Sequence, residues 1–207
     1  MTPSTGDRQI SGDDQVLASW NRIEGWLTQH APRTLRSLNP PGQFEAIRAA
    51  ERSLGVVFPG DLVTSLLRHD GVRGEDDQGE VDPAAFCLPS EHRPLSVTEI
   101  VAMTGLLRSV QGDSATGEWW RPSYLLVASY DVTTDGTVLD CNSGRTGVFS
   151  RMSGCTFVGP ASLGGLLAEA ADGLEQGRAL FIDMDEEEIA DQALDAVPLN
   201  ERAVIWP

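Results

Sequence analysis

His69 and Asp70 are the two residues best suited to chemistry by type and spacing, because they stand side by side near the end of "VFPGDLVTSLLRHDGV". A His–Asp pair can supply two ligands of the metal centre in a phosphohydrolase. Such a centre needs further ligands on neighbouring helices, and the sequence holds only two other histidines, His30 and His92. The pair also suits a helix end, where histidine meets the negative end of the dipole and Gly71 can turn left-handed. The sequence therefore favours a helix terminus and predicts neither a metal nor a cofactor.

A second candidate for metal binding is the stretch "DVTTDGTVLDCN". Asp131, Thr133 and Asp135 occupy alternate positions as in a calcium loop, and Gly136 stands at the sharp turn. The twelfth position is Asn142 where a bidentate glutamate is expected, and the flanking residues resemble strands rather than helices. A β-turn at Asp135–Gly136 explains the same residues more simply, and the sequence favours it.

The sequence also lacks the usual signatures of a nucleophile or a phosphate-binding loop. Gly-x-Ser-x-Gly, GxxxxGK[ST] and GxGxxG patterns are all absent. Cys87, Cys141 and Cys155 have unrelated spacings, which predicts free thiols in a reducing compartment rather than disulfides or a zinc site. We therefore expect a protein that is not an enzyme.

The net charge of −16 is the most unusual bulk property of this 207-residue chain. Phosphate backbones and anionic membranes repel such a chain, so the charge disfavours nucleic acids and membranes as partners and favours a basic protein. The alternative is that the charge serves solubility alone. No apolar run approaches the roughly 18 residues that span a bilayer, and the N-terminus lacks the pattern of a secretory signal. We therefore expect a cytoplasmic protein.

Apolar residues at helical spacing predict helices over residues 13–32, 40–54, 59–68, 96–112 and 162–176. Ser96, followed three residues later by Glu99, has the signature of a capping box. Glu51 is an acid on the apolar side of the second helix, so we expect it at the rim of the core or in a structural hydrogen-bond network.

Short β-rich runs separated by Gly, Asp and Asn turns follow residue 122, and they predict an antiparallel meander. The first run, 125–130, is apolar at both alternating sets of positions, so it should be buried on both faces. Residues 183–207 are acidic and predict a short amphipathic helix or a partly disordered tail. We therefore expect a disordered N-terminus over 1–12, a folded domain over 13–180 and an acidic C-terminal extension over 181–207.

The order of these parts resembles the SUKH superfamily, the Smi/Knr-type domain, over about residues 14–180. Its signature is a Glu-bearing helix that ends in Leu-Gly, then a Pro, then a Leu-rich helix that ends in His-Asp-Gly, with a later Trp-x-Pro and a strand Asp. The matching positions are Glu51, Leu54, Gly55, Pro59, Asp61, Leu62, Leu66, His69, Asp70, Gly71, Trp120, Pro122 and Asp140. The departures are Phe58 and Gly60 around the Pro, the acidic loop 75–82 and the acidic tail. The resemblance implies an α+β fold, in which several helices pack a mostly antiparallel sheet of about four to six strands.

The resemblance also implies a non-catalytic binding module. Bacterial members look like immunity proteins that neutralise toxin domains, often nucleases, of polymorphic toxin systems, and the fungal relatives are regulators of cell-wall synthesis that act as interaction hubs. The charge favours an immunity protein, because an acidic surface mimics phosphates and speeds encounter with a basic toxin. The alternative is a regulatory scaffold similar to the fungal relatives.

The residues that we expect to contact the partner are the acids of the 75–82 loop and one aromatic anchor. These residues are Glu75, Asp76, Asp77, Glu80, Asp82 and Trp119. The opposing interpretation is that the loop is an ordinary solvated surface segment. Of the adjacent pair Trp119–Trp120, we expect one ring in the core and the other at a surface or interface.

Overall fold

The computed structural model describes residues 12–76, 78–112, 120–130, 134–183, 188–189 and 197–207. Its helices are α1 (Gly12–His30), α2 (Pro32–Leu35), α3 (Phe44–Leu54), α4 (Gly60–Arg68), α5 (Val97–Gly112), α6 (Leu163–Glu175) and the 3-10 helix η2 (Leu199–Glu201). Its strands are β1 (Arg93–Pro94), β2 (Tyr124–Ser129), β3 (Gly136–Asp140), β4 (Thr146–Ser150), β5 (Gly154–Thr156), β6 (Leu180–Asp183), β7 (Glu188–Ile189) and β8 (Ala203–Ile205). The predicted α+β class is confirmed.

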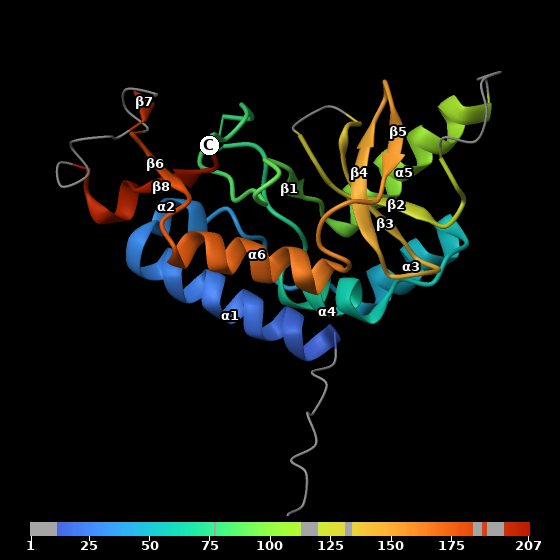
Figure 1. Ribbon diagram of the computed structural model, residues 1–207, viewed down its shortest axis with the longest axis horizontal. Coiled ribbons are helices and arrows are strands. Elements are labelled where there is room, and N and C mark those ends of the chain that lie inside the picture. The colour runs from blue at the N-terminus through green and yellow to red at the C-terminus, as the bar shows by residue number, and fades with distance from the viewer. Residues whose placement is uncertain (1–11, 77, 113–119, 131–133, 184–187, 190–196) are drawn as a thin grey trace, which may run out of the picture.

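Helix α1 forms where the sequence predicts it, with Asp13 and Asp14 in the first turn at the positive end of the dipole. Its apolar side is fully buried, including Trp20 and Ile23. Figure 1 shows α1 and α6 side by side, and α1 also contacts α4. An ion pair of 2.6 Å between Arg22 and Asp172 joins α1 and α6 at their polar edge.

Helix α3 begins later than the prolines before it predict. Gln43 is its N-cap residue and Phe44 its first helical residue. The segment before it is extended, because the Pro40 carbonyl accepts a bond from the backbone N–H of Asp70 at 3.0 Å and Gly42 donates to Leu66. These bonds tie the segment to the end of α4 and delay the helix.

The five-stranded sheet has the order β1–β2–β3–β4–β5, and every neighbouring pair is antiparallel. This is the predicted meander with one additional strand, β1, in front of it. All six residues of β2 are buried, as expected, whereas Tyr130, the last residue of the predicted run, follows the strand and is 51% exposed. Helix α5 packs against β2, and Thr104 in α5 accepts a bond from the backbone N–H of Leu126 at 3.1 Å.

A second, three-stranded antiparallel sheet has the order β7–β6–β8. The sequence predicts a helix or a tail for residues 183–207, and this prediction is wrong for the described part, which contains β7 and β8. Trp206 is only 8% exposed, and its indole N–H donates to the Cys87 carbonyl at 2.7 Å. The domain boundary at residue 180 stays a prediction, although Val204 and Trp206 belong to the same hydrophobic core as α1.

Candidate interaction site

The His69–Asp70 pair lies where α4 ends and makes structural bonds. His69 is the C-cap residue of α4; its Nδ1 lies 2.8 Å from the Asn39 carbonyl and its Nε2 lies 3.0 Å from Glu24. The Asp70 carboxylate accepts a bond of 2.7 Å from the backbone N–H of Val97 and so satisfies a donor in the first turn of α5. The pair therefore connects α1, α4 and α5, as the helix-terminus interpretation requires.

The motif residues of the first two signature helices also have structural surroundings. Glu51 is 7% exposed and accepts bonds from the backbone N–H of Phe58 at 2.9 Å and from Arg48 at 2.7 Å. Gly55 has the left-handed φ of 66° at the C-cap of α3, as predicted. Pro59 is the N-cap residue of α4, and Leu62 is buried in the core.

The later motif residues surround the aromatic core of the sheet. Trp120 is 1% exposed and packs edge-on against Phe149, with 5.1 Å between ring centroids. Arg108 donates to the Pro122 carbonyl. Asp140 accepts bonds from the Ser143 hydroxyl at 2.7 Å and from the backbone N–H of Asn142 at 3.1 Å. Partial burial alone would raise the pKa of Asp140, but these bonds lower it below its usual value.

The acidic loop forms a small turn whose backbone closes at the bridge between Glu75 and Val81. Asp76 holds the turn, because its carboxylate accepts bonds from the backbone N–H groups of Gln78 at 2.8 Å and Glu80 at 3.0 Å. These two bonds lower the pKa of Asp76. Glu75 and Glu80 are exposed. The loop therefore presents acids to solvent on a hydrogen-bonded backbone.

Asp82 differs from the expectation of an exposed contact residue. It is 2% exposed, pairs with Arg33 at 3.1 Å and accepts a bond from the backbone N–H of Ala84 at 3.0 Å. A buried charge requires such partners, so Asp82 anchors the loop to the body and is not available at its surface. Asp77 and Trp119, the other two expected contact residues, lie outside the described residues.

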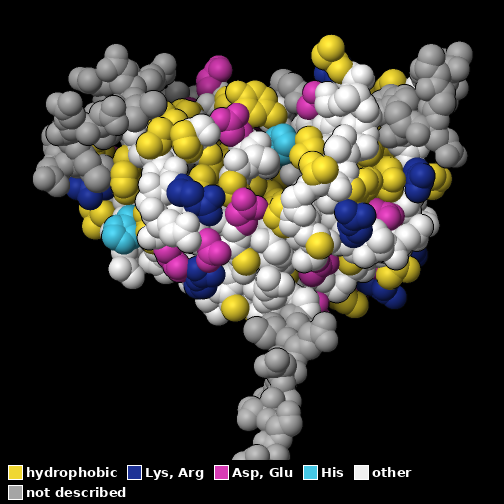
Figure 2. Space-filling view, viewed as in Figure 1, with side chains coloured by type: hydrophobic (Ala, Val, Ile, Leu, Met, Phe, Trp, Pro, Cys, Tyr) yellow, Lys and Arg dark blue, Asp and Glu magenta, His cyan; other side chains and the backbone are white. Residues whose placement is uncertain are grey.

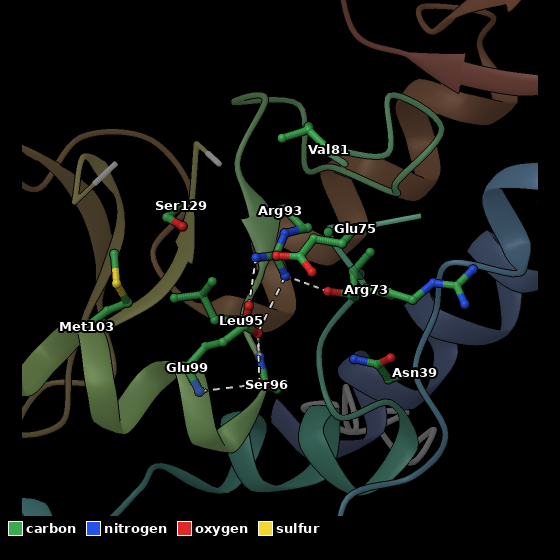
Figure 3. Close-up of a pocket in the computed structure, with 12 residues that line it drawn as sticks. Asn39, Arg73, Glu75, Val81, Arg93, Leu95, Ser96, Glu99, Met103 and Ser129 are labelled. Carbon is green, nitrogen blue, oxygen red and sulfur yellow. Dashed lines mark hydrogen bonds and ion pairs between the residues drawn. The ribbon is translucent and has the colours of Figure 1, made fainter. Parts of the chain in front are cut away.

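A cavity of about 560 Å³ opens beside the acidic loop, and we call it the Arg93 cavity. Figure 3 shows that its walls come from the loop, from β1, from α5 and from the end of β2. Its charged lining residues are Arg73, Glu75, Arg93 and Glu99, and its apolar ones are Val72, Val81, Leu95 and Met103. One of the expected contact residues, Glu75, therefore borders a concave surface.

The polar floor of the cavity is an ion pair built on the capping box of α5. Arg93 donates to Glu99 at 2.7 Å, and Ser96 donates its backbone N–H to Glu99 at 2.8 Å. In return the Ser96 hydroxyl accepts from the backbone N–H of Glu99 at 3.3 Å, which confirms the predicted capping box. Partial burial alone would raise the pKa of Glu99, but the bonds from Arg93 and Ser96 lower it.

Sequence reasoning missed Arg93. The residue is 8% exposed although arginine is almost never buried without a partner, and its partners Glu99 and the Val72 carbonyl become apparent only in the fold. The one available signal was the proline that follows it, since an X-Pro dipeptide favours extended backbone.

The described part of the chain holds no assembled metal site. There, no three His, Cys, Asp or Glu side chains are grouped to hold a metal ion. Asp135 accepts bonds from Ser150 and from the backbone N–H of Arg151, whereas Asp131 and Thr133 lie outside the described residues. No helix of the described residues is long and apolar enough to cross a membrane.

The cysteines are free thiols, and two of them are poorly suited to nucleophilic chemistry. Burial raises the pKa of Cys141 to about 12 and that of Cys155 to about 11. Since the thiolate is the reactive form, both side chains are unreactive near neutral pH.

No protein-family model matches the chain, but three curated fungal proteins are similar to part of it. The "KNR4/SMI1 homolog" of Kluyveromyces lactis is 35% identical over 99 residues, which is 48% of this chain and 18% of the relative. The "KNR4/SMI1 homolog" of Eremothecium gossypii is 28% identical over 105 residues, which is 49% of this chain and 15% of the relative. The "Cell wall assembly regulator SMI1" of Saccharomyces cerevisiae is 27% identical over 106 residues, which is 51% of this chain and 20% of the relative.

These similarities are to proteins named after KNR4 and SMI1, the same group as the resemblance seen in the sequence motifs. The matched part is about half of this chain but at most one fifth of each relative. The finer assignment to bacterial immunity proteins has no counterpart among these relatives.

Proposed function

We propose that this chain is a non-catalytic protein-binding module and that it acts as a regulator, the role given in the name of its yeast relative, "Cell wall assembly regulator SMI1". One observation carries the proposal. The motif residues that could do chemistry are occupied in structural bonds, whereas Glu75 and Glu80 are exposed beside a cavity. The similarity to a yeast protein named as a regulator supports the same conclusion.

The partner of this module is a basic protein. The net charge of −16 and the exposed acids of the loop favour a basic surface and speed its approach by electrostatic steering. The same charge disfavours nucleic acids and anionic membranes. We propose that this interaction takes place in the cytoplasm.

The experiment that tests the proposal is affinity capture of the full-length tagged protein from its own cells, followed by mass spectrometry. We expect stoichiometric capture of a basic protein, reduced when Glu75 and Glu80 are both changed to Gln. The matched control is Glu45→Gln combined with Glu201→Gln, which removes two exposed acids elsewhere. Equal capture by the wild type and the loop variant would exclude the loop as the contact surface.

A second candidate is an immunity protein that neutralises a basic toxin domain such as a nuclease. The specific observation in its favour is the strongly negative charge, because acids at the surface can imitate the phosphates that a nuclease binds. The same capture experiment separates the two candidates. A captured nuclease whose activity returns after the complex is dissociated would favour the immunity protein, and captured cell-envelope or signalling proteins would favour the regulator.

A further inference from the structure

Helix α3 carries an exposed row of one aromatic and two basic side chains. Phe44, Arg48 and Arg52 follow one another at four-residue spacing, so they lie on the same side of the helix. All three are exposed, and the guanidinium carbon of Arg48 lies 5.9 Å from the centroid of the Phe44 ring. In Figure 1, α3 lies at the right-hand edge of the molecule. The row therefore faces solvent.

An open groove of about 330 Å³ lies beside this row. Arg48 and Arg52 line it on the helix, and Val56 and Val57 line it where the chain leaves α3. Val57 is 72% exposed, and a Cβ built at Gly55, between the helix and the valines, would meet nothing within 4 Å. The surface thus combines basic and apolar groups. We call it the Arg52 groove, and it consists of Phe44, Arg48, Arg52, Val56 and Val57.

The groove is basic because the acid in its wall is already paired. Glu51 is the one acid among the described lining residues, and its side chain is only 8% exposed. One carboxylate oxygen accepts a bond from the backbone N–H of Phe58 at 2.9 Å, and the other accepts from Arg48 at 2.7 Å. The exposed acid of α3, Glu45, does not line the groove. A ligand in the groove therefore meets arginine rather than carboxylate.

Arg52 has no acidic partner within the described part of the chain. Its side chain makes no ion pair or hydrogen bond there, whereas Arg22 and Arg68 pair with acids on neighbouring elements. Arg48 uses one terminal nitrogen for Glu51, and its side chain is still 51% exposed. A guanidinium group can bind a carboxylate through two parallel N–H bonds, so both arginines suit acidic side chains.

We propose that the Arg52 groove binds an extended acidic segment of a protein partner. Arg48 and Arg52 are four residues apart on a helix, which corresponds to about 6 Å along its axis. Side chains at alternate positions of an extended segment are about 6–7 Å apart and point to the same side. Two such carboxylates pair with the two arginines, and apolar side chains next to them lie against Phe44 and Val57.

This inference goes beyond the proposed function, because it concerns a second surface of opposite charge. The net charge of −16 opposes long-range attraction of an acidic segment, so the groove acts through short-range contacts. At physiological salt the Debye length is about 8 Å, which limits repulsion by acids elsewhere on the chain. The chain thus offers the acidic loop to a basic protein and the Arg52 groove to an acidic segment.

The test is an NMR titration of the full-length protein, at about 50 mM salt, with two capped peptides that differ only in charge, Ac-LSESESL-NH2 and Ac-LSQSQSL-NH2. We expect the acidic peptide to shift the backbone signals of Arg48, Arg52 and Val57 and to bind at least about fivefold more tightly than the neutral one. Absent shifts, shifts confined to another face, or equal affinity for the two peptides would overturn the proposal. So would a short oligothymidylate that shifts these signals when the acidic peptide does not.

Two variants and a control assign the binding to the groove. Arg52→Gln removes a side chain without internal partners, and we expect it to weaken the acidic peptide about fivefold. Val57→Ser removes exposed apolar surface and should weaken the peptide about twofold. Arg151→Gln, at a side chain 65% exposed in the turn between β4 and β5, is the matched control and should change the affinity by less than about 1.5-fold. Equal affinity of Arg52→Gln and the wild type would contradict the assignment.

The loop variant keeps this inference distinct from the proposed function. Changing Glu75 and Glu80 to Gln leaves the Arg52 groove intact, so the acidic peptide should bind this variant at least as tightly as the wild type. Weaker binding to the loop variant than to Arg52→Gln would place the peptide at the loop and reject the groove. Acidic-peptide binding at α3 without any captured basic protein would reject the proposed function and keep the groove.

Discussion

Gly71 is the residue in the His-Asp-Gly motif whose type the fold requires most strictly. Its φ is +67°, and a Cβ at this position would overlap the backbone of Leu95 and Ser96. Gly144 has a similar φ of +69° but has nothing within 4 Å of such a Cβ. Comparing substitutions at the two glycines therefore separates the cost of the left-handed backbone conformation from the cost of a steric clash.

We predict that Gly71→Ala lowers the free energy of unfolding by at least about 2 kcal/mol more than Gly144→Ala does. Gly144→Ala should cost about 1 kcal/mol, because only the left-handed backbone conformation opposes it. Urea unfolding of both variants measures the difference. Equal losses would mean that the chain at Gly71 can move away from Leu95 at little cost.

His92 is half-buried next to Thr137, with 3.0 Å between Nδ1 and the hydroxyl oxygen. Burial lowers its pKa below the ordinary value of 6.5, although the charge of Asp135 acts in the opposite direction. The unfolded chain therefore binds a proton at a higher pH than the folded protein does. The contribution of His92 to the free energy of unfolding is fully present above about pH 6.5, and it falls as the pH drops towards the pKa of His92 in the folded protein.

We predict that the wild type loses more stability than His92→Gln when the pH is lowered from about 8 to about 5.5, because glutamine does not titrate. Denaturant unfolding at the two pH values gives this difference directly. Stability curves of the two proteins that stay parallel over this range would show that His92 protonates equally well in the folded state.

The sequence alone predicts the structural role of some single residues but not of others. His69, Asp70 and Gly71 occur together where helices end, and the structure places them there. Asp82 and Glu75 are both acids in one acidic run, and only the position of Arg33 determines that Asp82 is buried. No local pattern separates these two acids, because the contact joins residues 49 positions apart.

At the scale of helices and strands, the sequence predicts those elements whose ends are marked by residues close in the chain. The capping box at Ser96 marks the beginning of α5, and Gly55 marks the end of α3, because both depend on neighbours within four residues. Strand β1 has two residues, one of them a proline, and forms only because β2 supplies its partners at Ala128 and Ser129. The cavity that β1 borders was unpredictable for the same reason.

The C-terminal strand was missed because its stabilising contacts come from the other end of the chain. The Val204 N–H donates to Thr34 at 3.0 Å, and Arg33 donates its N–H to the Arg202 carbonyl at 3.1 Å. A Cβ on Gly173 would lie 2.7 Å from the Trp206 ring, so α6 has a glycine where the ring packs. The contacts of β8 thus join α2 and α6.

We predict that Trp206→Ala destabilises the protein by about 3–5 kcal/mol, since it removes a buried ring and leaves a cavity. Leu199→Ala, at a residue 48% exposed in the same C-terminal region, should cost less than about 0.5 kcal/mol. Thermal unfolding of the two variants compares them. A Trp206→Ala variant as stable as the wild type would indicate that β8 contributes little to the fold.

At the scale of the whole molecule, the acidic side chains do not form one continuous negative surface. Figure 2 shows basic and acidic side chains interspersed on one face, with apolar side chains between them. Arg22 and Arg68 each pair with acids on neighbouring elements, so these charges act within the fold. The acidic loop differs, because Glu75 and Glu80 are exposed and Glu75 lies at the rim of a cavity. Electrostatic attraction between partners should therefore concentrate at this loop.

The most direct test of a partner-binding acidic loop is the dissociation constant of the captured partner for three proteins. These are the wild type, the loop variant Glu75→Gln/Asp76→Asn/Glu80→Gln and the control Glu45→Gln/Glu91→Gln/Glu201→Gln, measured at about 50 and about 300 mM salt. We predict that the loop variant binds at least about tenfold more weakly at low salt and loses most of its salt dependence, whereas the control binds like the wild type. Equal weakening in the loop variant and the control would show that only net charge matters. Unchanged binding in the loop variant would contradict the account.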